Sequence, residues 1–421
     1  MSYANPTTAD KASATGIENR ILHALSFAKE TLRLLAAEGY DDPETLPDKI
    51  LPEKVIGETA FLLYAAWLTS DPVIIEKVDE IARILEPYSR SKKILIGICL
   101  HPALAIEYAQ AHVFLTRIGY PDERFDAMLE KSINAQSHFG RERPPHRMLE
   151  QEWVKRVWNK SSEPAEKYII DAIAYSTMAR PVDLLHGTRE DLYAFTHALM
   201  YAMCFNSAPW GVKKENAAIL DEAEAMLARC LDEEDYDLAG ELLLAWPLTG
   251  SHWSALATLA FNVLLRVEDE ASFLPSPATR VDILQKLEGE QRKKYFHATA
   301  YHTVYVMGLL CSASIKADRI PVQNITANET ASGISDKLLS FLDLNNQAPH
   351  WLSCFSKLTG AEQDSLVDLL LNVAMYRNVQ QKQYGAVFEL VRIAYDTGAG
   401  SQELVTQAAE LLDRLSLVAG T

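Results

Sequence analysis

Apolar residues recur every three or four positions along most of the chain, which is the spacing of one buried face of a helix. The segment from Ile17 to Ala37 shows the pattern clearly, and it returns in segment after segment as far as Leu417. Strand–helix alternation of the kind that builds a doubly wound sheet is missing from the pattern. The sequence therefore predicts an all-α protein of antiparallel helical hairpins, arranged either as an α/α toroid or as an irregular helical array.

Breaks in the helical pattern divide the chain. Residues 1–16 are small and polar, which predicts a disordered tail. Residues 17–316 form a main helical domain, and a polar segment from 317 to 334 separates it from a C-terminal helical subdomain at 335–421. Within the main domain, Pro102 is expected to break or kink the long apolar stretch that surrounds it.

The most informative stretch runs from Asp183 to Phe205. Thr188 can cap a helix there, and Tyr193, His197 and Tyr201 follow at intervals of four, so they share one helix face. In so apolar a helix this face is expected to be buried, where hydroxyl and imidazole groups need partners. The face either packs into the core with backbone partners or lines a pocket, and both alternatives stay open.

A second polar face occurs in the stretch 288–312. His302 lies there between Tyr301 and Tyr305, in a helix that is otherwise strongly apolar. Because a buried imidazole is costly unless it is bonded, two polar helix faces satisfy each other most cheaply by meeting. We therefore expect His197 and His302 to approach each other in the folded protein.

Charged residues gather at two other places. The loop and helix from Ser137 to Trp158 contain Arg143 and Arg147, which either grip a carboxylate or phosphate or pin two helices through salt bridges. The acids from Asp232 to Asp237 suit a helix N-terminus, with Glu241 one turn after Asp237, although they also resemble an aspartate-rich magnesium motif.

Composition narrows the classes of function. The chain has 421 residues and a net charge of -17, which argues against binding to nucleic acid or to an anionic membrane. No apolar run reaches the ~20 residues that span a bilayer, and the N-terminus has no apolar signal core. The five cysteines are widely spaced among apolar residues, which favours reduced core thiols and a cytoplasmic protein.

Three segments resemble an uncharacterised, all-helical bacterial family associated with natural-product gene clusters. They contain D-L-Y-A-F-T-H-A-L-M-Y, E-R-P-P-H-R-M-L-E-Q-E-W and Y-H-T-V-Y-V-M-G-L-L, and the likeness covers residues 90–315. The resemblance groups these segments and implies a biosynthetic role, but it assigns no catalytic residue. Nucleotide-binding, zinc-protease and serine-hydrolase motifs are missing from the sequence.

Two functions fit these features. The first is a natural-product tailoring enzyme that binds a small, partly apolar, anionic intermediate between helices and uses histidine acid/base or metal chemistry. The second is a helical scaffold or regulatory interaction protein, and an oligomer is compatible with either.

The enzyme hypothesis gives each group of residues a role. The catalytic candidates are His197, His302, Tyr193 and Tyr201. The substrate-binding candidates are Arg143, Arg147, Tyr301 and Tyr305. In the alternative with a divalent metal ion as cofactor, the ligand candidates are His197, His302, Glu107, Glu190 and Asp191.

Overall fold

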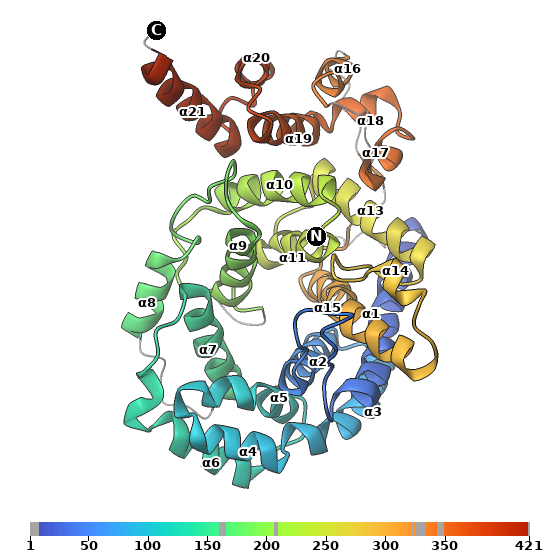
Figure 1. Ribbon diagram of the computed structural model, residues 1–421, viewed down its shortest axis with the longest axis vertical. Coiled ribbons are helices and arrows are strands. Elements are labelled where there is room, and N and C mark those ends of the chain that lie inside the picture. The colour runs from blue at the N-terminus through green and yellow to red at the C-terminus, as the bar shows by residue number, and fades with distance from the viewer. Residues whose placement is uncertain are drawn as a thin grey trace, which may run out of the picture.

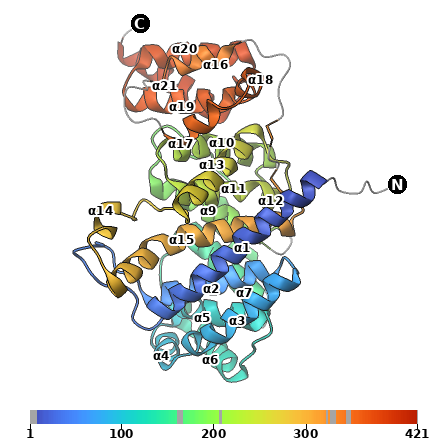
Figure 2. The same cartoon turned by 90° about the vertical axis from the view of Figure 1, so that its right-hand side faces the viewer.

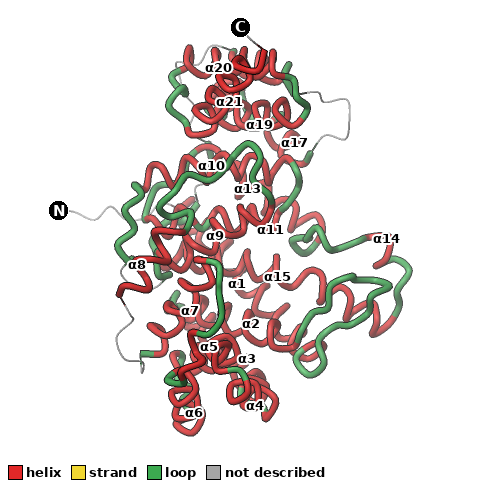
Figure 3. Tube along the Cα trace, turned by 60° about the vertical axis from the view of Figure 1, so that its left-hand side comes forward, coloured by secondary structure: helices red, strands yellow, loops and turns green. Residues whose placement is uncertain are grey.

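The computed structural model of the chain describes residues 8–159, 166–205, 209–321, 324–325, 333–342 and 349–419. Throughout these ranges the regular structure is helical, and the only β pairing is an isolated bridge between Tyr40 and Ile50 (Figure 3). The prediction of an all-α fold is confirmed.

Six inner helices form a closed ring (Figure 1). Around the ring they are α2 (Pro52–Trp67), α5 (Ala105–Arg117), α7 (Pro145–Trp158), α9 (Arg189–Ala202), α11 (Tyr236–Leu243) and α15 (Gly289–Lys316). Each helix contacts the next, and α15 contacts α2. The architecture is therefore toroid-like, which is the first of the two arrangements that the sequence predicts.

An outer layer of helices surrounds this ring and buries its apolar outer faces (Figure 1). The outer helices are α1 (Thr8–Leu35), α3 (Pro72–Ser89), α4 (Lys92–Leu100), α6 (Glu123–Ile133), α8 (Glu166–Tyr175), α10 (Asn216–Asp232) and α13 (Ala255–Ala271). Short elements join them: η1 (Pro102–Leu104), η2 (Gln136–Phe139), α12 (Ala245–Thr249) and α14 (Val281–Leu284).

The C-terminal helices stack on one end of the molecule, against α10 and α13 (Figures 1 and 2). They are α16 (Ile334–Leu339), α17 (His350–Phe355), α18 (Gly360–Asp364), α19 (Val367–Gln380), α20 (Tyr384–Thr397) and α21 (Glu403–Ala419). Residues 317–333, parts of which lie outside the described ranges, contain no described helix, as the polar composition there predicts.

Several local predictions can be compared with the structure. The long apolar stretch breaks at Pro102, and the helical segments on either side are bent by 117° relative to each other. Helix α1 begins at Thr8, so the second half of the predicted disordered tail is helical, and residues 1–7 lie outside the described part. All five cysteines are free, but only three are buried, because Cys99 is exposed and Cys354 is half-buried.

Among the described residues, no single helix is long and apolar enough to cross a bilayer. Only the bent pair of Lys92–Leu100 and Pro102–Arg117 reaches that length and apolar composition, and only when its two parts are taken together.

Helices α1 and α2 lie very close to α15 at Gly308. A Cβ atom there would lie 2.7 Å from a methyl carbon of Leu62 and 2.8 Å from the Cβ of Ala24, so α1 and α2 approach too closely for any side chain. Because the Ala24 Cβ is fixed to its backbone, it can move away only if helix α1 moves with it.

We predict that Gly308→Ala lowers the free energy of unfolding by roughly 1–3 kcal/mol through overpacking. The matched control is Gly385→Ala in α20, where an added Cβ meets nothing within 4 Å. That variant is expected to be unchanged or slightly more stable, since alanine is the better helix former. Thermal melting of the two variants checks this, and a Gly308→Ala protein as stable as wild type would contradict it.

Candidate functional site

A cavity of about 220 Å³ lies at the centre of the ring. All six inner helices or their ends contribute to its lining, which explains why residues far apart in the sequence meet there. The lining residues are Lys54, Glu58, Phe61, Gln110, Arg147, Glu150, Tyr193, His197, Met200, Tyr201, Glu241, Leu244, His302, Tyr305, Val306 and Leu309.

His197 and His302 meet at the carboxylate of Glu241. The Glu241 Oε1 atom lies 3.8 Å from His197 Nε2 and 3.5 Å from His302 Nε2, so the two ring nitrogens are no farther apart than the sum of these distances. Thr196 donates a hydrogen bond of 2.5 Å to the other oxygen, Oε2. The expected approach of the two histidines is thus found, and a buried carboxylate mediates it.

Two further carboxylates surround His302. Its Nδ1 lies 3.2 Å from Glu58 Oε2, and its Nε2 lies 3.7 Å from Asp237 Oδ1. Asp237 is held in place by Thr303, which donates at 3.1 Å, and by Arg189, whose Nη2 lies 3.2 Å from its Oδ2. The imidazole remains 31% exposed, so it is open to the cavity as well as paired.

These contacts shift the pKa values of the group in opposite directions. Burial alone would lower the pKa of His302, but the surrounding carboxylates hold it well above its ordinary value. Burial alone would raise the pKa of Glu58, but His302 lowers it to about 2. For Asp237, burial and the negative charge of Glu241 raise the pKa despite the opposing effect of His302.

The predicted polar face of α9 lines the cavity beside this group. A capping box of Thr188 and Asp191 fixes the start of the helix, and the ring centroids of Tyr193 and His197 then lie 3.9 Å apart. His197 is 8% exposed, and its Nδ1 is buried without a hydrogen-bond partner among the described residues.

Arg147 and Glu150 of α7 form a second polar part of the lining. Arg147 Nη1 donates to Glu150 at 2.7 Å, and its Nη2 donates to the Tyr193 hydroxyl at 3.1 Å. The Tyr201 hydroxyl donates to Glu150 at 3.1 Å. Both tyrosine hydroxyls are therefore held by the Arg147–Glu150 pair.

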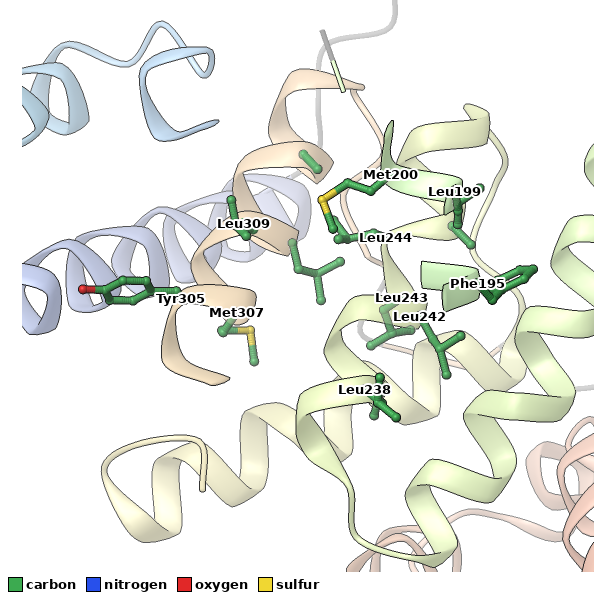
Figure 4. Packing of buried hydrophobic residues seen from close by; sticks show 14 of the residues in the cluster. Phe195, Leu199, Met200, Leu238, Leu242, Leu243, Leu244, Tyr305, Met307 and Leu309 are labelled. Atoms are coloured by element: carbon green, nitrogen blue, oxygen red, sulfur yellow. The ribbon is translucent and has the colours of Figure 1, made fainter. Parts of the chain in front are cut away.

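Apart from Lys54 and Gln110, the rest of the lining is apolar and aromatic. Met200, Leu244 and Leu309 belong to this part of the lining, and Tyr305 points away from Met200 and Leu244 (Figure 4). The Tyr305 hydroxyl lies 2.9 Å from Thr59 Oγ1, so its polar end is already paired. A ligand in the cavity would thus contact apolar surface on one side and ionised groups on the other.

Two of the predicted substrate-binding residues do not line the cavity. Arg143 donates to the backbone oxygen of Ala103 and lies 3.6 Å from Glu107, so it pins the loop to η1, as the salt-bridge alternative predicts. Tyr301 is 1% exposed and packs against Tyr305 with ring centroids 5.3 Å apart.

The carboxylates named as metal ligands in the sequence lie elsewhere. Glu190 is exposed, Asp191 caps α9, and Glu107 accepts from Gln151 at 3.3 Å. Among the residues that the structure describes, no group of three or more His, Cys, Asp or Glu side chains is arranged to hold a metal ion. The predicted ligand set is therefore not assembled.

Of the acids that do reach the histidines, Glu58 was not singled out in the sequence. Asp237 and Glu241 were noted only with the acidic run that suits a helix start or resembles an aspartate-rich magnesium motif. Glu58 follows Lys54 by one turn, which is the spacing of an ordinary surface pair. The other two follow an acidic run at the start of α11, where Asp235 caps the helix by accepting from Leu238 N at 3.2 Å. The available signal was their i, i+4 spacing within an apolar helix.

We predict that His302 remains an imidazolium at neutral pH and titrates above the ordinary histidine range near 6.5. Glu58→Gln removes one of its carboxylate partners and is expected to lower the His302 pKa, as seen in imidazole NMR chemical shifts against pH. The control is Glu130→Gln on α6, which replaces an exposed carboxylate outside the cavity. Titration of His302 at or below the ordinary range in the wild-type protein would refute the pairing.

Pairing of His302 also makes stability depend on pH. A histidine whose pKa is raised in the folded state stabilises fully below its unfolded pKa of about 6.5, and that stabilisation is lost as the pH rises through the folded value. The His302→Gln variant is therefore expected to be most destabilised, relative to wild type, in mildly acidic solution. An equal difference in melting temperature at mildly acidic and alkaline pH would contradict this.

Comparison with known proteins gives a family and no activity. No curated protein and no solved structure matches the chain. Residues 21–312 match a family described as "Domain of unknown function (DUF6895)", and this range contains every residue that lines the cavity. The chain therefore belongs to the DUF6895 family, whose function is unknown.

Proposed function

We propose that this protein is an enzyme that carries out acid/base chemistry on a small, partly apolar molecule in the central cavity. The observation that carries the proposal is the convergence of ionisable side chains from four inner helices, which are Glu58, His197, Asp237, Glu241 and His302. Burying charges costs free energy that a purely structural ring would avoid by using apolar side chains. The non-catalytic scaffold explains the helices but gives no reason for this cluster.

Each member of the cluster has a distinct role in the proposal. His302, kept protonated by its carboxylates, donates a proton to the bound molecule as a general acid. Glu241 and Glu58 stay ionised and stabilise the imidazolium. His197 contacts the substrate from the cavity wall, and Tyr193 holds the His197 ring in position by packing against it.

The substrate is proposed to be a biosynthetic intermediate because of the resemblance to a family associated with natural-product gene clusters. The cavity supports only its size and its mixed polarity. An anionic group was expected from the arginine-rich loop. Of Arg143 and Arg147, only Arg147 lines the cavity, and Glu150 offsets its charge.

The test is turnover in a mixture of small metabolites. Purified protein is incubated with a metabolite extract, and mass spectrometry identifies compounds consumed or formed. We expect His302→Gln to slow that conversion by about 10²–10⁴-fold, the usual contribution of a general acid. Glu130→Gln is the control and is expected to retain the wild-type rate.

Two outcomes would contradict the proposal. One is a conversion that His302→Gln and Glu241→Gln leave unchanged although both variants are folded. The other is the absence of any conversion across extracts from several sources, which would favour the scaffold. Elemental analysis of the same preparation tests whether the protein binds a metal ion. A stoichiometric metal ion would support the alternative in which a divalent metal is the cofactor.

A further inference from the structure

Among the well-enclosed groups around the histidine pair, carboxylates outnumber cations. Three carboxylates lie within 4 Å of a histidine ring nitrogen, and they are Glu58, Asp237 and Glu241. Three cations face them. His302 is the most enclosed of the three, while Lys54 and Arg189 have side chains 54% and 46% exposed, so water screens their charges.

The carboxylate of Glu241 keeps capacity for a ligand. Its side chain is 3% exposed, and Thr196 donates to Oε2. Oε1 lies 3.5 Å and 3.8 Å from the two imidazoles, which is ion-pair rather than hydrogen-bond distance. A donor from a bound molecule can therefore reach this oxygen without displacing an existing hydrogen bond.

His197 gives an independent indication that a ligand belongs here. Its ring lines the cavity and is 8% exposed, yet its Nδ1 has no hydrogen-bond partner among the described residues. A buried polar atom without a partner is costly unless a ligand or water supplies one. His197 and Glu241 line the same cavity.

The cavity also offers aromatic surface to a bound molecule. Phe61, Tyr193, Tyr201 and Tyr305 line the cavity together with Met200 and Leu309. Aromatic faces attract organic cations, and carboxylates beside such faces are a common way to bind an ammonium group. An anion would be repelled by these carboxylates. It would find no free positive charge at Arg147, because Glu150 already pairs with that guanidinium at 2.7 Å.

We propose that the molecule bound in this cavity is a small organic amine. Its cationic nitrogen lies against Glu58 and Glu241, and its apolar body lies against the aromatic and aliphatic wall. This inference rests on the proposed function in that it concerns the same site, and it replaces the anionic group expected from the arginine-rich loop with a cationic one.

Probes of one shape and different charge test the inference. Benzylammonium, benzyl alcohol and benzoate are titrated into the full chain at neutral pH by isothermal calorimetry, with butylammonium as an aliphatic amine. We expect both amines to bind, with benzylammonium at least about ten-fold tighter than benzoate because it meets carboxylates instead of being repelled by them.

Variants connect binding to the site. Glu241→Gln keeps the shape of the side chain but removes its charge, and it is expected to weaken benzylammonium binding by about ten-fold or more. Glu58→Gln removes the charge of the second carboxylate in the same way and is expected to weaken it too. Glu130→Gln replaces an exposed carboxylate on α6 and is expected to bind like wild type. Melting temperatures of all three variants show that the fold is retained.

Three results would overturn the amine proposal: tighter binding of benzoate or benzyl alcohol, amine binding that neither cavity variant weakens, or no binding by either amine. None of these results bears on turnover. If His302→Gln abolishes a conversion whose substrate is neutral or anionic, the acid/base function stands and the amine assignment fails. If benzylammonium binds as expected but no conversion is found, the site is a binding site and the proposed function fails.

Discussion

The carboxylate of Glu241 is the group on which the arrangement of the inner ring depends. It is almost fully buried, and a buried charge is tolerated only where opposite charges and hydrogen-bond donors surround it. Thr196 and His197 reach it from α9, and His302 reaches it from α15. One side chain of α11 thus fixes how three helices face one another.

The need for charged partners extends beyond Glu241. His302 carries a positive charge that needs partners of its own, and Glu58 brings α2 into the group. Asp237 in turn needs Arg189, the first residue of α9, so the start of α9 is tied to the start of α11. Because each pairing requires the next, the polar groups and the closed ring specify the same geometry, which is the consistency expected of a well-defined native state.

The helices could be predicted from the sequence, and so could the place of His197 and His302 in the site. The carboxylates that pair with these histidines were harder to recognise. Helical periodicity is repeated over many turns, so the all-α fold could be read directly, and a histidine between tyrosines in an apolar helix is unusual enough to be noticed. Glu58 and Glu241 could not be recognised in the same way. Acids near lysines or near a helix start are typical of solvated surfaces, and only the rotation of each helix in the ring decides whether they point inward. Arg143 shows the converse, because its loop position resembles a binding residue while its side chain is used to pin η1.

The C-terminal helices lie outside the family match and contribute no residue to the cavity lining. One connection to the site is direct, since the Tyr236 hydroxyl of α11 lies 3.1 Å from His350 Nδ1 of α17, and a second runs through α10. Arg377 of α19 makes two hydrogen bonds of 2.7 Å to Asp232 at the end of α10, and Trp351 of α17 donates to the same carboxylate at 3.1 Å. Helix α10 packs against α11, the helix that carries Glu241. The C-terminal helices therefore support the position of α11 from outside, since their side chains do not line the cavity.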